Sequence, residues 1–251
     1  MIHKQNHGVQ WLEFELLADC PLIHGCLMRH GGYSTGDLDS LNLGRHVGDT
    51  QKNVESNFKK VVNALSLSQL ATSRICHGAD VTEISSTNTP ISDGLMTRVE
   101  NLAISMSQAD CQAAIFYDPI NHALANIHCG RRSNVLNIYE NSVNAMKVGY
   151  GSNPKDLLVC ISPSLGPEHS EFINYRNELP EPFWDFQVKP LYFDLWAISE
   201  WQLRGSGVLP HHIQIARIDT YGSKDFFSVR SLRTCGRQAT ICALKSNSLT
   251  V

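Results

Sequence analysis

Residues 109–130 read ADCQAAIFYDPINHALANIHCG, a stretch with two short apolar segments separated by a turn. Residues 113–117 and 123–128 each have the length, the apolar composition and the bounding turn residues of a buried β-strand. The turn between them begins at Asp118-Pro119, where proline interrupts regular structure. This stretch therefore predicts two strands packed on at least one face.

Similar segments flank this pair along the chain. Further strands are predicted over residues 81–85, 157–161, 213–218 and 238–243. Helices are predicted after a cap at Asp49 or Thr50, over 134–147 and over 192–204. Residues 29–48, which are rich in Gly, Ser and Asp, are expected to form a long loop. Because strands and helices mix without strict βαβ alternation, the pattern predicts an α+β fold with mixed sheets.

The chain has 251 residues, of which 42% are hydrophobic and 18% charged, and a formal net charge of −3. This length can bury its own core, and with no linker-like stretch we expect a single domain over residues 1–251. The negative charge argues against a nucleic-acid partner, because neutralising phosphates needs a dense basic patch. No apolar run is long enough to cross a bilayer, and the N-terminus lacks the apolar segment of a secretory signal. A cytoplasmic protein without a membrane or nucleic-acid partner is expected.

Cysteine and histidine side chains in three short segments could hold a metal ion. The segments are Cys76-His77-Gly78, Asp110-Cys111 and His128-Cys129-Gly130. The eight cysteines include no CxxC pair, which argues against a zinc ribbon or a thioredoxin-like site. His77, Cys111 and His128 match a catalytic zinc set, in which three protein ligands leave the fourth position to water or substrate. The alternative is that they are buried and inert.

Eight short motifs occur in order along nearly the whole chain. They are RHGGYS (29–34), SLNLGRHVGD (40–49), ICHG (75–78), DGLMT (93–97), ADC (109–111), HCGRRS (128–133), SVRS (228–231) and CGR (235–237). In this order they resemble R-x-G-G-x-S, S-x-N-L-x-x-H-V-G-D, Q-V-H-G, D-G-x-x-T, A-D-C, H-A-G-W-R-G, S-x-R-R and T-G-R. This is the motif series of the YfiH family, also called the laccase-domain or multicopper polyphenol oxidase family.

The resemblance implies mixed β-sheets packed face to face with flanking helices, as an α/β/β/α layered fold. It implies a zinc-dependent purine nucleoside phosphorylase that cleaves adenosine, inosine and methylthioadenosine, with inorganic phosphate as co-substrate, and that also deaminates adenosine. A purine nucleoside is then the small-molecule partner. Carried over position by position, the zinc ligands are His77, Cys111 and His128, which would form the catalytic set together with Asp110.

The neighbours of the expected ligands have predicted roles of their own. Asp110 would act as a general acid or orient the site, with a turn carboxylate as the alternative. Asp93 together with Gly94 is interpreted first of all as a turn. If both metal-binding histidines lie on strands, Cys76 and Cys129 point to the opposite face, where they would be packing residues.

Binding of phosphate calls for arginine side chains and backbone N–H groups. The candidates in the motif-rich segments are Arg29, Arg45, His46, Arg132 and Arg230. A solvated surface position is the alternative for each arginine.

Five positions depart from the motif series of the family. They are Ile75, Cys129, Arg131, Ser133 and Ser231. These departures leave the three metal positions intact and alter the expected pocket wall, so metal binding is better supported than the range of substrates.

Three other functions are open on the sequence alone. A copper-dependent polyphenol oxidase needs several copper ions held by many histidines, often as HxH pairs, and this chain has no HxH. Cys111 and His128 could instead form the metal-free nucleophilic pair of a hydrolase. A binding protein could retain the fold with a weakened site. Metal analysis distinguishes these functions, because the phosphorylase needs about one zinc per chain and the oxidase several copper ions.

Overall fold

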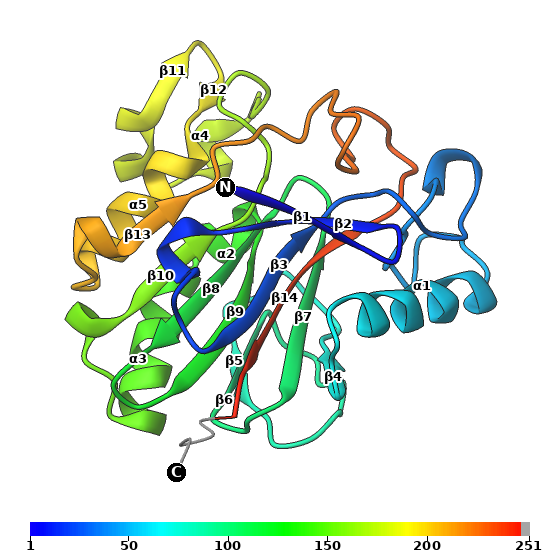
Figure 1. Cartoon of the computed structure of the whole chain (residues 1–251). Coiled ribbons are helices and arrows are strands. Elements are labelled where there is room, and N and C mark those ends of the chain that lie inside the picture. The colour runs from blue at the N-terminus through cyan, green and yellow to red at the C-terminus, as the bar shows by residue number, and fades with distance from the viewer. Residues whose placement is uncertain (247–251) are drawn as a thin grey trace.

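The computed structural model describes residues 1–246 and contains two six-stranded sheets that lie face to face (Figure 1). In strand order, the first sheet comprises β1 (Ile2–Asn6), β2 (Val9–Glu13), β3 (Leu22–Leu27), β14 (Gln238–Leu244), β7 (Leu102–Gln108) and β4 (Gln69–Thr72). The second comprises β13 (Ile213–Ile215), β10 (Leu158–Ile161), β8 (Gln112–Asp118), β9 (Ala123–Cys129), β6 (Gly94–Thr97) and β5 (Val81–Glu83). Each sheet combines parallel with antiparallel neighbours, so the predicted mixed sheets are confirmed.

The described part of the chain also contains α-helices, short 3₁₀ helices and a small separate strand pair. The helices are α1 (Gln51–Ala64), α2 (Arg131–Val135), α3 (Ile138–Tyr150), α4 (Tyr175–Glu178) and α5 (Leu195–Gly205). The separate strand pair consists of β11 (Gln187–Lys189) and β12 (Tyr192–Phe193).

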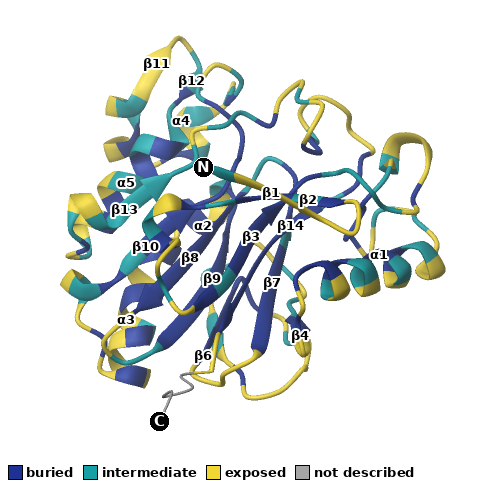
Figure 2. Cartoon of the chain, viewed as in Figure 1, coloured by how far each residue is buried: buried dark blue, intermediate teal, exposed yellow. Residues whose placement is uncertain are grey.

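The main hydrophobic core lies between the two sheets. Ile104 of β7 and Cys242 of β14 belong to the same buried cluster as Ile115 of β8 and Leu124 of β9. All seven residues of β8 are buried, because its alternate side chains pack against the other sheet on one face and against helices on the other. Figure 2 shows these central strands in dark blue.

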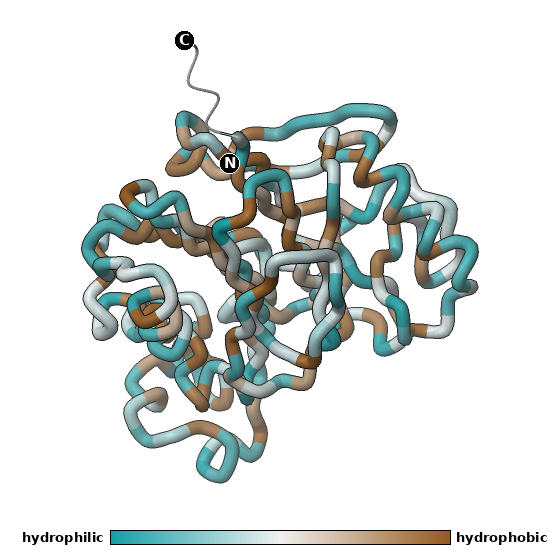
Figure 3. The backbone as a smooth tube through the Cα atoms, turned by 90° about the horizontal axis from the view of Figure 1, so that it is seen from below, coloured by the Kyte–Doolittle hydropathy of each residue, from teal (hydrophilic) through white to brown (hydrophobic). Residues whose placement is uncertain are grey.

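Helices cover the outer faces of both sheets. Val61 of α1 packs with Trp11 and Ile241 of the first sheet, while Val143 of α3 packs with Phe116 of the second. Figure 1 places α1 on one side of the sheets and α3 and α5 on the other, and the peripheral loops are mostly hydrophilic in the view turned by 90° (Figure 3). The predicted α/β/β/α layering is therefore confirmed. No helix within residues 1–246 combines the length and the apolar character needed to cross a membrane.

Local capping explains where the helices begin. Thr50 caps α1 by accepting a hydrogen bond from the N–H of Asn53 at 3.2 Å. The helix predicted over 134–147 is divided into α2 and α3 at Asn137, which has a left-handed φ of 53°. The helix predicted over 192–204 begins only after Asp194, whose carboxylate accepts the N–H of Ala197 at 2.9 Å.

Candidate functional site

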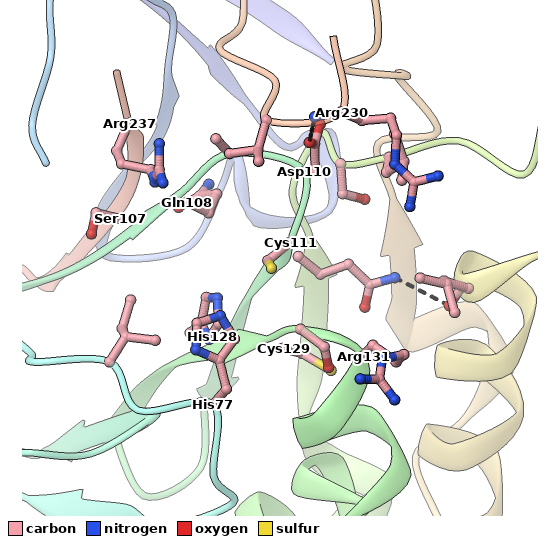
Figure 4. A pocket seen from close by; sticks show the side chains of 18 of the residues that line it. His77, Ser107, Gln108, Asp110, Cys111, His128, Cys129, Arg131, Arg230 and Arg237 are labelled. Carbon is pink, nitrogen blue, oxygen red and sulfur yellow. Dashed lines mark hydrogen bonds between the residues drawn. The ribbon is translucent and has the colours of Figure 1, made fainter. Parts of the chain in front are cut away.

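The predicted metal ligands come together at one end of β8 and β9. His77 lies in the loop after β4, Cys111 directly precedes β8, and His128 is the sixth residue of β9. Because β8 and β9 are antiparallel, with Ala113 opposite His128, the start of one strand lies beside the end of the other. The ligand atoms of His77, Cys111 and His128 all lie within 4.8 Å of one another (Figure 4). We call these three residues the ligand cluster.

The buried carboxylate of Asp93 holds both histidines of the ligand cluster in place. Asp93 Oδ1 lies 3.0 Å from Nδ1 of His128 and accepts the backbone N–H of His77 at 2.9 Å. Its Oδ2 accepts the N–H groups of Cys76 and Gly78. Engaging Nδ1 leaves Nε2 of His128 as the nitrogen for a metal. The Asp93-Gly94 segment, interpreted from sequence as a turn, thus also orients the ligand cluster.

Charge coupling within the cluster shifts the pKa values of its members. Burial alone would raise the pKa of the Cys111 thiol, but the imidazoles of His128 and His77 lower it to about 6. Burial opposes the charged form of His128 as well, yet Cys111 and Asp93 raise its pKa to about 9. Hydrogen bonds from His128, Cys76 and Gly78 outweigh burial and hold the pKa of Asp93 well below its usual range. The thiolate form that binds metals is therefore favoured at neutral pH.

Gly130 keeps space open beside the ligand cluster. A Cβ at this position would lie 3.1 Å from Cys111 Sγ and 3.1 Å from Cδ2 of His77, which is closer than ordinary van der Waals contact. Two imidazoles and one thiolate are donors that zinc prefers, and three protein ligands leave one coordination position for substrate. The donor set and the bare glycine backbone both fit a metal ion.

A cavity of about 790 Å³ includes the ligand cluster in its lining. Its volume lies within the range of small-molecule sites, roughly 300–1,000 Å³. Leu165, Phe172, Leu195 and Val229 give part of its wall an apolar surface. We call it the large cavity.

A second cavity of about 330 Å³ adjoins the large cavity, and we call it the small cavity. Both are lined by His77 and Arg237, so they are neighbours, and we call the two cavities together the cleft. Arg45 and His46, two of the predicted phosphate-binding residues, line the small cavity.

Asp110 lines the large cavity, with its carboxylate engaged in holding the surrounding loops. Oδ1 accepts a hydrogen bond from Thr220 Oγ1 at 2.7 Å, and Oδ2 accepts the backbone N–H of Arg230 at 2.7 Å. The Arg230 guanidinium, which also lines this cavity, donates to the carbonyl of His169 at 3.0 Å. These contacts position Arg230, and the general-acid role of Asp110 stays a prediction.

Two of the other predicted phosphate-binding arginines line neither cavity. The Arg29 guanidinium lies 4.4 Å from the centre of the Phe227 ring and donates to the carbonyl of Asp39. Arg132 is exposed on α2, whereas the preceding Arg131 lines the large cavity. The sequence Arg131-Arg132 does not show which of the two side chains faces the cleft, because this depends on the direction in which α2 runs. Sequence reasoning therefore missed Arg131 as a lining cation.

Most departures from the family motifs lie at the cleft. Ile75, Cys129, Arg131 and Ser231 line the large cavity, and Ile75 lines the small one as well. Ser133 is buried and lines neither cavity. Four of the five departures thus lie in the wall of the cleft, as the sequence predicted.

The two thiols next to the histidine ligands have different environments. Cys129 is buried among side chains that include α3 residues, as strand alternation predicts. The prediction for Cys76 is wrong, because His77 lies in a loop with a φ of 58° and not on a strand. Cys76 is exposed, and its thiol donates to Asp93 at 3.0 Å.

Comparison with known proteins places this chain in one family. The chain is 27% identical over 240 residues to the purine nucleoside phosphorylase LACC1 of Mus musculus, covering 89% of this chain but only 56% of that protein. It is 28% identical over 233 residues to a purine nucleoside phosphorylase of Bacteroides thetaiotaomicron, covering 83% of this chain and 86% of the relative. The crystal structure of YlmD from Geobacillus stearothermophilus matches with a TM-score of 0.87 at 26% identity, covering 98% of this chain and 99% of that one. The profile described as multi-copper polyphenol oxidoreductase laccase matches residues 23–245, and the chain belongs to this family.

Proposed function

We propose that this protein is a cytoplasmic, zinc-dependent purine nucleoside phosphorylase that also deaminates adenosine. The observation that carries the proposal is the ligand cluster, a His–Cys–His group whose donor atoms lie within 4.8 Å of one another in the wall of a cleft. Two relatives named purine nucleoside phosphorylases support the reaction class. Zinc is proposed over copper because two imidazoles and one thiolate form a catalytic zinc set.

The residues of the chain have distinct roles in this proposal. His77, Cys111 and His128 would hold the zinc, and Asp93 keeps His128 in the orientation that presents Nε2. When bound, zinc supplies a Lewis acid that lowers the pKa of water to about 7, which suits hydrolytic removal of an amino group from adenosine. The thiolate of Cys111 would partly neutralise the metal charge.

Phosphorolysis additionally requires a place for the purine and a place for phosphate. The apolar wall formed by Leu165, Phe172 and Leu195 suits a purine base. Arg45 and His46 in the small cavity supply donors for inorganic phosphate. An oxygen of phosphate bonds to C1′ of the ribose while the glycosidic bond breaks, and the base leaves with the electron pair and takes up a proton. Cationic side chains beside the cleft favour this charge distribution.

The functional unit in this proposal is the single domain predicted over residues 1–251. His77 follows β4 of the first sheet, whereas Cys111 and His128 belong to the β8–β9 pair of the second. Separating the sheets would therefore divide the proposed zinc site.

Incubation of the purified protein with adenosine, inosine and methylthioadenosine, with and without phosphate, tests the proposal. Free base that forms only with phosphate, and inosine that forms from adenosine without phosphate, are the expected products on chromatography. Cys111→Ala should remove both activities and the bound zinc. Unchanged nucleosides after incubation with the zinc-loaded protein, or polyphenol oxidation by a protein with several copper ions per chain, would contradict it.

A further inference from the structure

The cleft concentrates arginine side chains. Among residues 1–246, half of the arginines of the chain and none of its lysines line the two cavities. The six are Arg45, Arg74, Arg131, Arg230, Arg233 and Arg237. Guanidinium groups bind phosphate oxygens in a planar, bidentate manner, which lysine cannot do. A cavity lining that contains arginine but no lysine indicates recognition of phosphate groups.

Acidic side chains do not balance this charge. Among the described residues, Asp110 is the one carboxylate in the lining of either cavity, and both of its oxygens already accept hydrogen bonds. Glu178 of α4 approaches Arg131 only weakly, with 3.9 Å between its Oε2 and the arginine Nε. The cleft is therefore strongly cationic, although the chain as a whole has a net charge of −3.

The arginines fall into two groups on different sides of the ligand cluster. Figure 4 shows Arg237 on the side of Ser107 and Gln108, whereas Arg131 and Arg230 lie on the far side of Cys111. Arg237 also lines the small cavity, together with Arg45 and Arg74. Arg131, Arg230 and Arg233 line the large cavity alone. One inorganic phosphate bound in the small cavity would leave the second group without an anion.

We propose that the large cavity takes a purine nucleoside that itself carries a phosphate on its ribose, so that the substrate class is a purine nucleoside monophosphate. Arg131 is the specificity-determining residue in this proposal, and it stands where the motif series of the family has an aromatic residue. Arg131 holds its position by donating from Nη1 to the carbonyl of Glu178 at 3.3 Å, while its Nε faces the Glu178 carboxylate at 3.9 Å. The Nη2 group is then available for the phosphate. The inference rests on the proposed phosphorylase function.

The reaction balances with inorganic phosphate as the second substrate. A phosphate oxygen forms a bond to C1′, the bond between C1′ and the purine nitrogen breaks, and that nitrogen keeps the electron pair and is protonated. The products are the free purine base and a ribose bisphosphate. No oxidant or reductant is required.

Calorimetric titration of the full-length protein with adenosine 5′-monophosphate, adenosine, ribose 5-phosphate and inorganic phosphate tests this inference. We expect the monophosphate to bind about tenfold more tightly than adenosine or ribose 5-phosphate, since a charge-assisted bidentate contact adds to the contacts of the base. Arg131→Gln should weaken binding of the monophosphate about tenfold more than binding of adenosine, so that the preference is lost. Arg131→Lys should restore part of it.

Arg132→Gln is the matched control, because it removes the same charge from the adjacent residue, which is exposed and lines neither cavity. The inference is overturned if the wild-type protein binds the monophosphate no more tightly than adenosine, or if the two glutamine variants lose the preference equally. Equal binding of ribose 5-phosphate and the monophosphate would also overturn it, because the base would then not be recognised.

A separate turnover assay distinguishes failure of the inference from failure of the proposed function. Adenosine cleavage without a preference for the monophosphate rejects the inference alone. Preferential binding of the monophosphate without cleavage of any glycosidic bond rejects the phosphorylase function and leaves the ligand class standing.

Discussion

Two histidine–aspartate pairs have similar geometry and different surroundings. His128 Nδ1 lies 3.0 Å from Asp93 Oδ1 in the ligand cluster, and His169 Nδ1 lies 2.6 Å from Asp219 Oδ2 in the loops that adjoin Arg230. The side chains of the first pair are 3% and 0% exposed, whereas those of the second are 39% and 28% exposed. Breaking a buried pair costs about 3–5 kcal/mol, but an exposed pair contributes only about 0–1 kcal/mol.

The difference between the pairs lies in what the aspartate organises. Asp219 accepts the N–H groups of Gly166 and Tyr221 and so connects two loops. Asp93 accepts the N–H groups of Cys76 and Gly78, on both sides of the predicted zinc ligand His77, and also orients the imidazole of His128. The same two side-chain types therefore connect loops in one place and hold the ligand cluster in the other.

Loss of the Cys111 thiolate should have the largest effect on zinc binding. Cys111→Ala is expected to reduce bound zinc from about one per chain to nearly none, because the site loses a charged ligand out of three. Metal analysis by mass spectrometry after dialysis measures this. Cys129→Ala should retain zinc and lose only stability, since Cys129 packs on the other face of β9. Zinc loss in Cys129→Ala but not in Cys111→Ala would show that the wrong thiol was assigned.

Removal of the buried Asp93 carboxylate should have the next largest effect, on both stability and zinc affinity. Asp93→Asn places an amide donor against backbone N–H donors that need an acceptor, so we expect a loss of about 3–5 kcal/mol in the free energy of unfolding. Zinc should bind about 10–100-fold more weakly, because His128 loses its orienting partner. Urea denaturation and chelator competition measure the two effects. Equal losses in Asp219→Asn would remove the distinction between the pairs.

Much of the fold was predictable from short-range patterns. The apolar runs at 113–117 and 123–128 correspond to β8 and β9, and the Thr50 cap with its following apolar stripe corresponds to α1. The first four strands, β6, β7 and the β11–β12 pair were not predicted. β3 and β7 each pair with β14, which is distant in sequence, and no local pattern encodes such a pairing.

The three side chains of the candidate site were predictable from the sequence, whereas the hydrogen bonds that hold them in place were not. His77, Cys111 and His128 were identified by motif order, and they converge. The loop at Cys76 was misjudged because its path depends on hydrogen bonds to Asp93, 15 to 17 residues away. Arrangements that depend on such tertiary contacts cannot be inferred from alternation along a strand.

The pH dependence of Cys111 sharpens the contrast between the interior and the surface. In the metal-free protein its thiolate should form with a midpoint near pH 6, far below the usual value of about 8.5. Because the pKa is lowered on folding, this contribution to stability is complete above about pH 8.5 and is lost as the pH falls through about 6. Exposed Cys76 should react only at higher pH, since its hydrogen bond to Asp93 raises its pKa.

Alkylation with iodoacetamide across a pH series, with each site identified by mass spectrometry, measures both thiols. His128→Gln should move the Cys111 midpoint upward, because the imidazole that stabilises the thiolate is lost. A Cys111 midpoint at or above that of free cysteine would contradict the charge coupling in the ligand cluster.

The smallest loss of stability is expected for the partly exposed pair of His169 and Asp219. His169→Gln removes the hydrogen bond to Asp219 and the stacking on Tyr221, whose ring centre lies 4.0 Å from that of His169. It leaves the backbone carbonyl that accepts from Arg230 in place. We expect a change of less than about 1 kcal/mol in the free energy of unfolding and no change in zinc content.

A double-mutant cycle of His169→Gln with Asp219→Asn, measured by urea denaturation, gives the coupling energy of this pair directly. A coupling energy as large as that between His128 and Asp93 would mean that burial does not set the strength of these pairs. The different roles of Asp93 and Asp219 would then depend only on the loops that each aspartate connects.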